Sequence, residues 1–233
     1  MNWILANLPT IGHLTWLHLV QSLLPLVAGF LISLPLARLA ISRRGMGERA
    51  WQKPDRAASF NKVPGPGLRR GVVINSAALL YTIPSLALFV LMPVVLGTSI
   101  TSVWNVLIAL TLYVVAMMVR SAVDAFDSVP TQVLESATAM GYRPLARFWK
   151  VELPLSIPVM AAGLRVALVS NISMVSVGAV IGIQSLGTLF TDGLRRNIPA
   201  EILAGILATL ILALVLDRLL AFASSCLTTW RNP

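Results

Sequence analysis

The most strongly patterned polar stretch of the 233-residue sequence spans residues 129–154. A threonine followed by Glu135 is typical of the start of a helix, and Gly141 is typical of a residue that ends one in the left-handed conformation. Pro144 fits the first turn of a second short helix, and Pro154 is predicted to end that helix. The stretch is too polar to cross a membrane and too regular for a simple linker. It predicts a helix, a glycine turn and a second helix.

A second group of polar residues lies inside an apolar segment. Ser170, Ser173 and Ser176 step by three residues with Asn171 alongside, so they are predicted to share one arc of a helix. Such residues hydrogen-bond neighbouring helices or line a polar path, and the sequence leaves both roles open. Arg165 lies about two turns into the same segment, where an arginine faces a cavity or extends to the membrane surface.

Proline marks a third candidate position. Pro84 lies within an apolar run and frees a backbone carbonyl that a neighbouring helix or Ser85 is expected to satisfy, so a kink is predicted there. Tyr81 lies one turn before it. Together these residues form either a static kink or part of a gate in a translocation path.

Catalytic and metal chemistry are not expected. His13 and His18 have no cysteine, aspartate or glutamate nearby to complete a metal site, and Cys226 is the only cysteine. The sequence has no glycine-rich phosphate loop followed by lysine and serine or threonine, so no ATP site is expected in this chain. We therefore predict no catalytic residues, no metal and no cofactor.

Composition indicates a membrane protein. Hydrophobic residues make up 57% of the chain and charged residues 12%, about half the charged share of a soluble domain. The net charge of +9 is concentrated next to apolar segments, where a topology signal explains it better than nucleic-acid binding does. The first eight residues carry no basic region, so a cleavable signal peptide is not expected.

The elements that position these residues are five apolar segments long enough to cross a bilayer. The sequence therefore predicts an all-α, polytopic membrane helix bundle with a transmembrane domain over 16–223 and a loop at 120–156 that carries the helix pair. The expected spans are 16–40, 71–97, 103–119, 157–183 and 199–223.

Charge sets the expected orientation. The segment 42–70 holds eight lysines and arginines and is placed in the cytoplasm by the positive-inside rule. Segment 1–15 then lies outside, as a frayed end or an interfacial helix, and the tail 224–233 lies inside. Arg195 and Arg196 in an outer loop are the one dissonant feature. Whether 42–70 is a solvated linker or binds lipid headgroups or a partner stays open.

The polar loop resembles the permeases of binding-protein-dependent ABC importers. Their hallmark is Glu-Ala-Ala, three residues, Gly, nine residues and Ile-x-Leu-Pro in a cytoplasmic loop, and this sequence keeps that spacing with serine for one alanine and valine for isoleucine. The matching residues are Glu135, Ser136, Ala137, Gly141, Val151, Leu153 and Pro154. The resemblance implies a type I importer permease in which this loop is a coupling helix that docks on an ATP-binding subunit.

Within that family the sequence is most similar to osmoprotectant permeases. The stretches 81–89, 151–165 and 185–187 carry this resemblance. Two stretches depart from it: Gln184 to Gly187 stands where Gly-Ala-Gly-Gly-Leu-Gly is usual, and 42–70 is longer than the usual first inner loop. The implied solutes are glycine betaine, choline and carnitine, with methionine or another small polar solute as the alternative.

The resemblance also implies partners. These are a separate ABC ATP-binding subunit that holds ATP and Mg, a second permease chain of the same or a related kind, an extracytoplasmic solute-binding protein and the lipid bilayer of the bacterial inner membrane. No fused binding domain is expected beyond Pro233. A membrane enzyme would need a catalytic cluster at membrane depth, and a secondary transporter would normally carry more spans and ionisable coupling residues.

Overall fold

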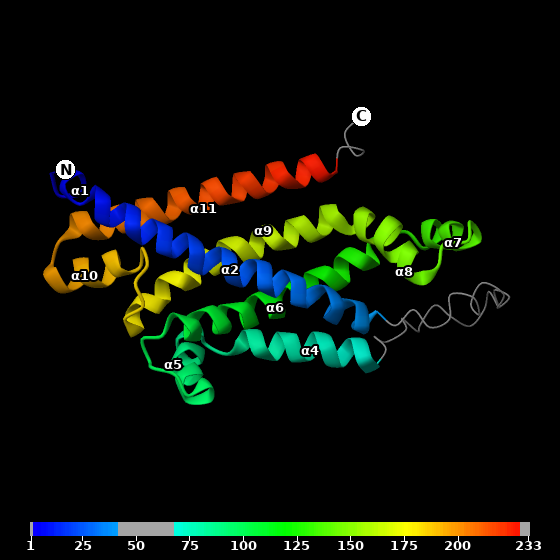
Figure 1. Cartoon of the computed structure of the whole chain (residues 1–233), viewed down its shortest axis with the longest axis horizontal. Coiled ribbons are helices and arrows are strands. Elements are labelled where there is room, and N and C mark those ends of the chain that lie inside the picture. The colour runs from blue at the N-terminus through cyan, green and yellow to red at the C-terminus, as the bar shows by residue number, and fades with distance from the viewer. Residues whose placement is uncertain (1, 42–67, 229–233) are drawn as a thin grey trace, which may run out of the picture.

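Long apolar runs fold into helices here because a helix satisfies every backbone polar group within its own segment. The computed structural model describes residues 2–41 and 68–228, and its regular elements over those ranges are all helical (Figure 1). The elements are α1 (Asn2–Ala6), α2 (Leu8–Ala40), α4 (Leu68–Thr82), α5 (Ser85–Leu96), α6 (Val103–Asp127), α7 (Thr131–Ala139), α8 (Pro144–Arg147), the π-helix η1 (Phe148–Glu152), α9 (Leu153–Val177), the 3-10 helix η2 (Gly178–Ile181), α10 (Thr188–Arg196) and α11 (Pro199–Leu227).

The long helices run lengthwise through the molecule, with α2 packed across α6, α9 and α4 (Figure 1). The described ends of the chain lie at opposite ends of the bundle, as an odd number of crossings requires. Helices α7 and α8 lie at the same end as the last turn of α2, whereas α10 and α5 lie at the other. The main core is built where α2, α6 and α9 meet, around Met118, Phe126, Leu168 and Ile172.

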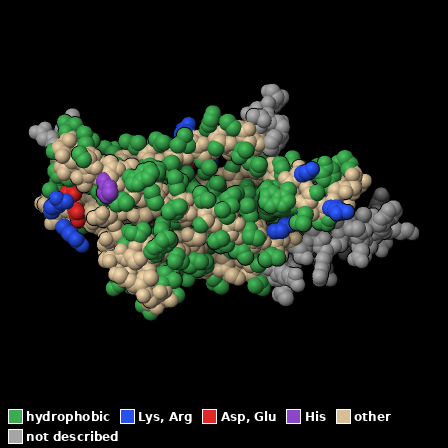
Figure 2. Space-filling view, in the orientation of Figure 1, with side chains coloured by type: hydrophobic (Ala, Val, Ile, Leu, Met, Phe, Trp, Pro, Cys, Tyr) green, Lys and Arg blue, Asp and Glu red, His purple; other side chains and the backbone are tan. Residues whose placement is uncertain are grey.

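The surface agrees with a membrane setting. On the face seen in Figure 2, hydrophobic side chains cover the middle of the molecule and charged ones gather toward its two ends. Four of the described helices are long and apolar enough to span a membrane, and the bent pair α4–α5 makes a fifth candidate. The predicted all-α bundle of about five spans is confirmed.

The first helix begins earlier than predicted. Helix α2 starts at Leu8 rather than near Trp16, and the short helix α1 precedes it. Pro9 lies in the first turn of α2, where its missing N–H needs no partner and its fixed φ favours helix. Most of segment 1–15 is therefore helical rather than frayed.

The second segment is not one continuous span. Its two halves, Arg70–Thr82 and Ser85–Leu96, are bent by 99° at the break before Ser85. Pro84 takes an extended conformation with φ −60° and ψ 133°, which interrupts the helix. The predicted kink at Pro84 is confirmed, and it is a full break between two helices within the span predicted over 71–97.

Pro154 does not end a short helix. From Pro144 to Ile181 the chain forms one helical stretch of 38 residues, into which the π-turn η1 is inserted. Leu153 N–H donates to Phe148 O, five residues back, and this wider turn makes room ahead of a proline that cannot donate. The predicted stop at Pro154 is wrong because a proline is tolerated in a first helical turn.

The remaining boundaries differ by several residues. Helix α6 runs to Asp127 rather than 119, and α11 runs to Leu227 rather than 223. The basic segment 42–70 lies outside the described residues except for its last three, and the tail is described only to residue 228. Arg70 forms an ion pair with Asp127 at 2.6 Å, which ties the start of α4 to the end of α6.

Candidate functional sites

Gly141 shapes the turn between α7 and α8. Its φ of +85° lies in the left-handed region, as the sequence predicted. The amide of Gly141 donates to Thr138 O at 3.0 Å and that of Tyr142 donates to Ala137 O at 3.1 Å. This pair of bonds is the Schellman motif, which satisfies the last carbonyls of α7 and needs a residue that tolerates positive φ.

The predicted motif residues on α7 divide between its two faces. Ala137 is buried together with Leu134, so the helix is anchored by its apolar face. Glu135 and Ser136 are exposed on the other face. The small side chain of Ala137 is explained by packing, whereas Glu135 is available to a partner.

Apolar side chains surround the glycine turn on the outside. Leu145 is 76% exposed, Met140 70% and Trp149 62%. These three residues, here called the apolar knob, lie at the end of the bundle outside the long helices (Figure 1). Exposed apolar clusters of this kind mark protein or membrane contacts. Sequence reasoning missed them, although methionine, leucine and tryptophan in an otherwise polar loop were a visible signal.

The two short helices are joined to each other. Arg147 Nη1 donates to Thr138 Oγ1 at 2.6 Å, and Thr138 Oγ1 donates to Leu134 O at 2.8 Å. The helix pair is thereby braced independently of the glycine turn.

The base of the helix pair is tied to the bundle through Glu152. Val151, Leu153 and Pro154, which the motif singled out, are partly buried in η1 and the first turn of α9. Glu152 between them is fully buried and accepts a hydrogen bond from Arg38 Nη1 at 3.0 Å. Sequence reasoning missed this ion pair because Glu152 occupies the variable position of the motif.

Aromatic contacts reinforce this base. The Arg38 guanidinium lies 5.0 Å from the centre of the Phe148 ring, a cation–π distance. Phe148 in turn contacts Phe126 at a ring-centre distance of 5.5 Å. Helices α2 and α6 therefore both contact η1. A displacement of the helix pair is expected to move both of these helices.

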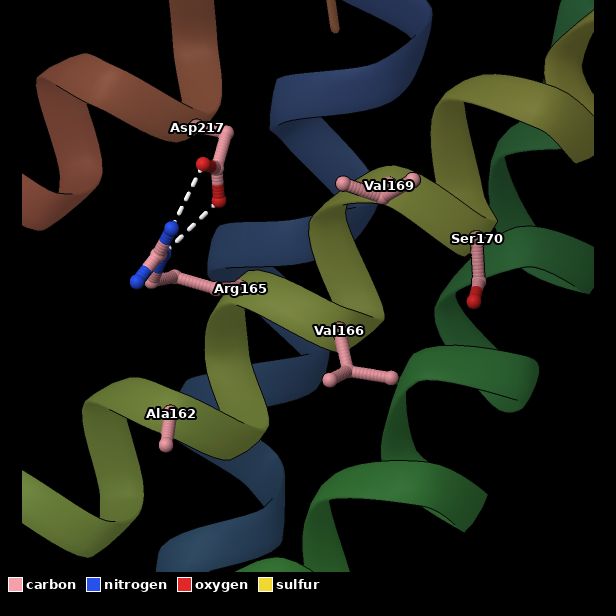
Figure 3. A pocket seen from close by; sticks show the side chains of 6 residues that line it. All are labelled: Ala162, Arg165, Val166, Val169, Ser170 and Asp217. Carbon is pink, nitrogen blue, oxygen red and sulfur yellow. Dashed lines mark hydrogen bonds and ion pairs between the residues drawn. The ribbon is translucent and has the colours of Figure 1, made fainter. Parts of the chain in front are cut away.

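A second site lies between α9 and α11. Arg165 Nε donates to Asp217 Oδ1 at 2.7 Å and Arg165 Nη2 donates to Asp217 Oδ2 at 2.6 Å (Figure 3). Arg165, for which the sequence leaves open a cavity or the membrane surface, therefore pairs with Asp217 between two spans. No local pattern indicates this pairing, because the two residues are 52 positions apart.

A cavity of about 400 Å³ opens beside this ion pair. Its lining comes from one face of α9 and from Asp217, and consists of Ala162, Arg165, Val166, Val169, Ser170 and Asp217. Ser170 lies at the far end of the cavity from the ion pair (Figure 3). The cavity thus combines a charged end with an apolar wall.

The other predicted polar residues of α9 are not brought together. Asn171 is buried and its Nδ2 donates to Ser22 O on α2 at 2.6 Å, so it acts between helices. Ser173 is exposed, and Ser176 packs closely against Gly187. Of the predicted arc, only Ser170 lines the cavity.

Buried polar groups on α2 form further hydrogen-bonding contacts with α9 and with the chain that follows it. His18 is fully buried, and its Nε2 lies 3.0 Å from Ile172 O, while Gln21 Nε2 donates to Gln184 O at 2.8 Å. With the Asn171 bond, these contacts fasten α2 to α9 and to the chain that follows α9. The sequence shows of His18 only that it has no cysteine, aspartate or glutamate nearby to complete a metal site.

The break at Pro84 is stabilised from α6. The Tyr113 hydroxyl donates to Ile83 O, so a neighbouring helix satisfies a carbonyl at the break. Tyr81 packs edge-to-face on Tyr113 with ring centres 6.0 Å apart. Ser85 begins α5. Over the ranges 2–41 and 68–228, no three histidine, cysteine, aspartate or glutamate side chains are grouped so as to hold a metal ion.

Comparison with known proteins adds to this geometry. The profile of the family described as "Binding-protein-dependent transport system inner membrane component" matches residues 66–225. The osmoprotectant import permease protein OsmW of Salmonella typhimurium is 39% identical over 151 residues, which cover 64% of this chain and 70% of OsmW. The choline transport system permease protein OpuBB of Bacillus subtilis is 28% identical over 214 residues, which cover 92% of this chain and 87% of OpuBB.

A solved structure is similar in fold. A chain of the methionine ABC transporter MetNI in an inward-facing conformation aligns with a TM-score of 0.69 at 21% identity, covering 92% of this chain and 93% of that one. The similarity extends over nearly the whole of both chains. At this identity it bears on the fold alone.

Proposed function

The chain belongs to the family of binding-protein-dependent transport system inner membrane components, and on that premise we propose that it forms the membrane path of an ATP-driven importer of compatible solutes. It is a multi-pass permease component of the inner membrane. ATP and Mg are bound by a separate subunit, and a solute-binding protein delivers the solute from outside.

The observation that carries the ATPase contact is the exposed helix pair at one end of the bundle. The apolar knob of Met140, Leu145 and Trp149 is exposed in the isolated chain, and an ATPase groove would bury it. Glu135 lies exposed on the adjoining helix and is suited to pair with a basic group of that groove. The Schellman turn and the Arg147–Thr138 bond support a rigid element that transmits force.

The helix pair is connected directly to the membrane-spanning helices. The π-turn η1 continues into α9 without a break, and Arg38 and Phe126 connect it to α2 and α6. A rigid-body shift on ATP binding would therefore tilt α9 against its neighbours. The residues proposed to respond are Arg165 and Ser170 in the cavity and the break at Tyr81, Pro84 and Ser85.

A second permease chain completes the path in this proposal. Alternating access needs two halves that rock about a shared pathway, and α9 leaves one stripe, with Ala162, Val166, Val169 and Ser173, uncovered in the single chain. Whether that second chain is identical or related is a matter for purification.

The substrate class rests on similarity to OsmW and OpuBB, whose names specify osmoprotectants and choline. We propose glycine betaine, choline or carnitine as solutes. Methionine or another small polar solute is the second candidate, the alternative that the sequence leaves open. A secondary transporter is disfavoured by the family assignment itself.

Reconstitution tests this function. The chain, its ATPase subunit and its binding protein are placed in proteoliposomes, and uptake of labelled glycine betaine, choline, carnitine and methionine is measured with and without ATP. The proposal predicts ATP-dependent and binding-protein-dependent uptake of a quaternary ammonium solute. Uptake of methionine alone would refute the substrate class, and uptake without any ATPase subunit would refute the importer mechanism.

A further inference from the structure

We propose that the cavity beside Arg165 and Asp217 is a binding site, within the permease itself, for solutes that carry both a carboxylate and a quaternary ammonium group. This inference rests on the proposed function and names the chemistry of one step in the path. In it the solute carboxylate binds the Arg165 guanidinium, and the ammonium methyl groups lie on the apolar wall.

The ion pair lies near the middle of α9, where a charged group needs polar surroundings. Arg165 lies 12 residues from Leu153 and 12 from Val177, at the middle of α9. At 1.5 Å per residue this is roughly 18 Å from either end of the helix. Charged groups at such depth are costly beside lipid and normally face a bundle interior or a water-filled cavity. The Arg165 side chain is nevertheless 42% exposed in the single chain, whereas that of Asp217 is 19% exposed.

The geometry of the Arg165–Asp217 pair leaves the Nη1 group of the guanidinium free of contact with the Asp217 carboxylate. Both bonds to Asp217 use Nε and Nη2, so the hydrogens of Nη1 point away from that carboxylate. Asp217 fixes the plane of the guanidinium, and this preorganises the remaining donors for a second carboxylate. Asp217 is thus a positioning residue, and Arg165 is the residue that touches the solute.

Charge balance favours a zwitterion over a net ion. The Arg165–Asp217 pair is neutral overall, so a neutral zwitterion adds no net charge at membrane depth. Ala162, Val166 and Val169 lie on the same face of α9 as Arg165 and form an apolar wall (Figure 3). The methyl groups of a quaternary ammonium can pack against that wall, whereas a solute group that must donate hydrogen bonds would find no acceptor on it.

Size and lining agree with a small solute held loosely. The volume of about 400 Å³ is at the lower end of small-molecule sites, which range over roughly 300 to 1,000 Å³. The lining residues include no aromatic ring, so an ammonium that lacks a carboxylate gains no cation–π contact there. The site is therefore expected to bind glycine betaine and carnitine more tightly than choline.

The alternative is that the pair only fastens α9 to α11. Three variants separate the two roles. Arg165→Gln removes the charge that the carboxylate needs, and Arg165→Lys keeps a pair with Asp217 but loses the planar fork. Asp217→Asn keeps an oxygen that accepts a bond from the guanidinium, so it preserves the proposed contact. If the pair were purely structural, Arg165→Gln and Asp217→Asn would disturb it equally.

The test is equilibrium binding of labelled glycine betaine to the purified permease–ATPase complex without the binding protein. We expect saturable binding in the wild type, competed by carnitine and only weakly by choline. Arg165→Gln should weaken it at least about tenfold, as expected for loss of a charged hydrogen bond, and Arg165→Lys by a smaller factor. Asp217→Asn should weaken it less than about threefold. Arg218→Gln, next to the pair but outside the cavity, is the matched control and should bind like the wild type.

Two outcomes overturn the inference. One is absence of saturable binding in a wild-type complex that does transport glycine betaine when the binding protein is added. The other is equal loss of binding in Arg165→Gln and Asp217→Asn. Failure of the wild-type complex to transport any betaine-type solute would instead refute the proposed function, so the two failures are told apart by the uptake assay.

Discussion

Replacing Gly141 by valine tests whether the glycine turn sets the docking geometry. The backbone there has φ +85°, and an added Cβ would meet no heavy atom within 4 Å. The substitution therefore causes no collision with a neighbouring side chain. Its whole effect comes from the backbone conformation, which makes the magnitude simple to estimate.

A β-branched residue held in the left-handed region costs about 1 to 3 kcal/mol. If the turn relaxes instead, the equilibrium constant for correct placement of α7 and α8 falls by about 5- to 150-fold. Because only correctly placed helices dock, the apparent affinity for the ATPase falls by up to the same factor. Gly141→Asn should lose much less, since asparagine tolerates positive φ.

The assay is co-purification of the ATPase subunit with the tagged permease, together with solute-stimulated ATP hydrolysis. Gly97→Val is the matched control: Gly97 also has positive φ, +65°, and open space around its Cβ site, but it ends α5 at the opposite end of the bundle. We expect Gly141→Val to lose ATPase binding and Gly97→Val to keep it at similar membrane levels. Equal ATPase binding by the two variants would refute the reasoning.

Three further predictions concern the packing around the sites and the topology. Arg38→Met removes one partner charge of fully buried Glu152 and should lower the free energy of unfolding more than Glu152→Gln, which leaves an arginine that reaches solvent. Thermal unfolding in detergent measures both variants, and the reverse order would contradict this prediction. Tyr113→Phe leaves Ile83 O without its donor and should cost about 1 to 3 kcal/mol, whereas Tyr81→Phe should stay within about 0.5 kcal/mol; equal losses would show that the hydroxyl does not stabilise the break. Cys226 is exposed and should resist a membrane-impermeant maleimide in intact cells yet react after permeabilisation, and strong labelling of intact cells would overturn the predicted orientation.

Local sequence signals predicted the features that depend on a few neighbouring residues. Gly141 was expected to be left-handed because a helix had to end there, and Pro84 was expected to disturb its helix because it cannot donate a hydrogen bond. Both were found. The contact that satisfies the break at Pro84 was not predictable from local spacing, because its donor, Tyr113, is 30 residues from Ile83.

Features that depend on distant partners were missed. Arg38 and Glu152 are 114 residues apart, and Arg165 and Asp217 are 52 apart, so neither pairing follows from local spacing. Pro154 was misread because the rule that proline ends a helix competes with the rule that proline fits a first turn, and the π-turn before it decides in favour of the second. The three-residue spacing of Ser170, Ser173 and Ser176 overstated their common face, since such a step drifts around the helix.

The most direct test of the central claim is a photo-crosslinking amino acid placed at Met140, in the apolar knob, in cells that express the complete transporter. Leu194 on α10 is the matched position, since it is 75% exposed against 70% for Met140 but lies at the opposite end of the bundle. The account predicts that irradiation joins the ATPase subunit to the permease through position 140 and not through position 194. Capture of the ATPase through position 194, or its absence from the position-140 adduct in a transporter that still takes up solute, would contradict the assignment of this helix pair as the coupling element.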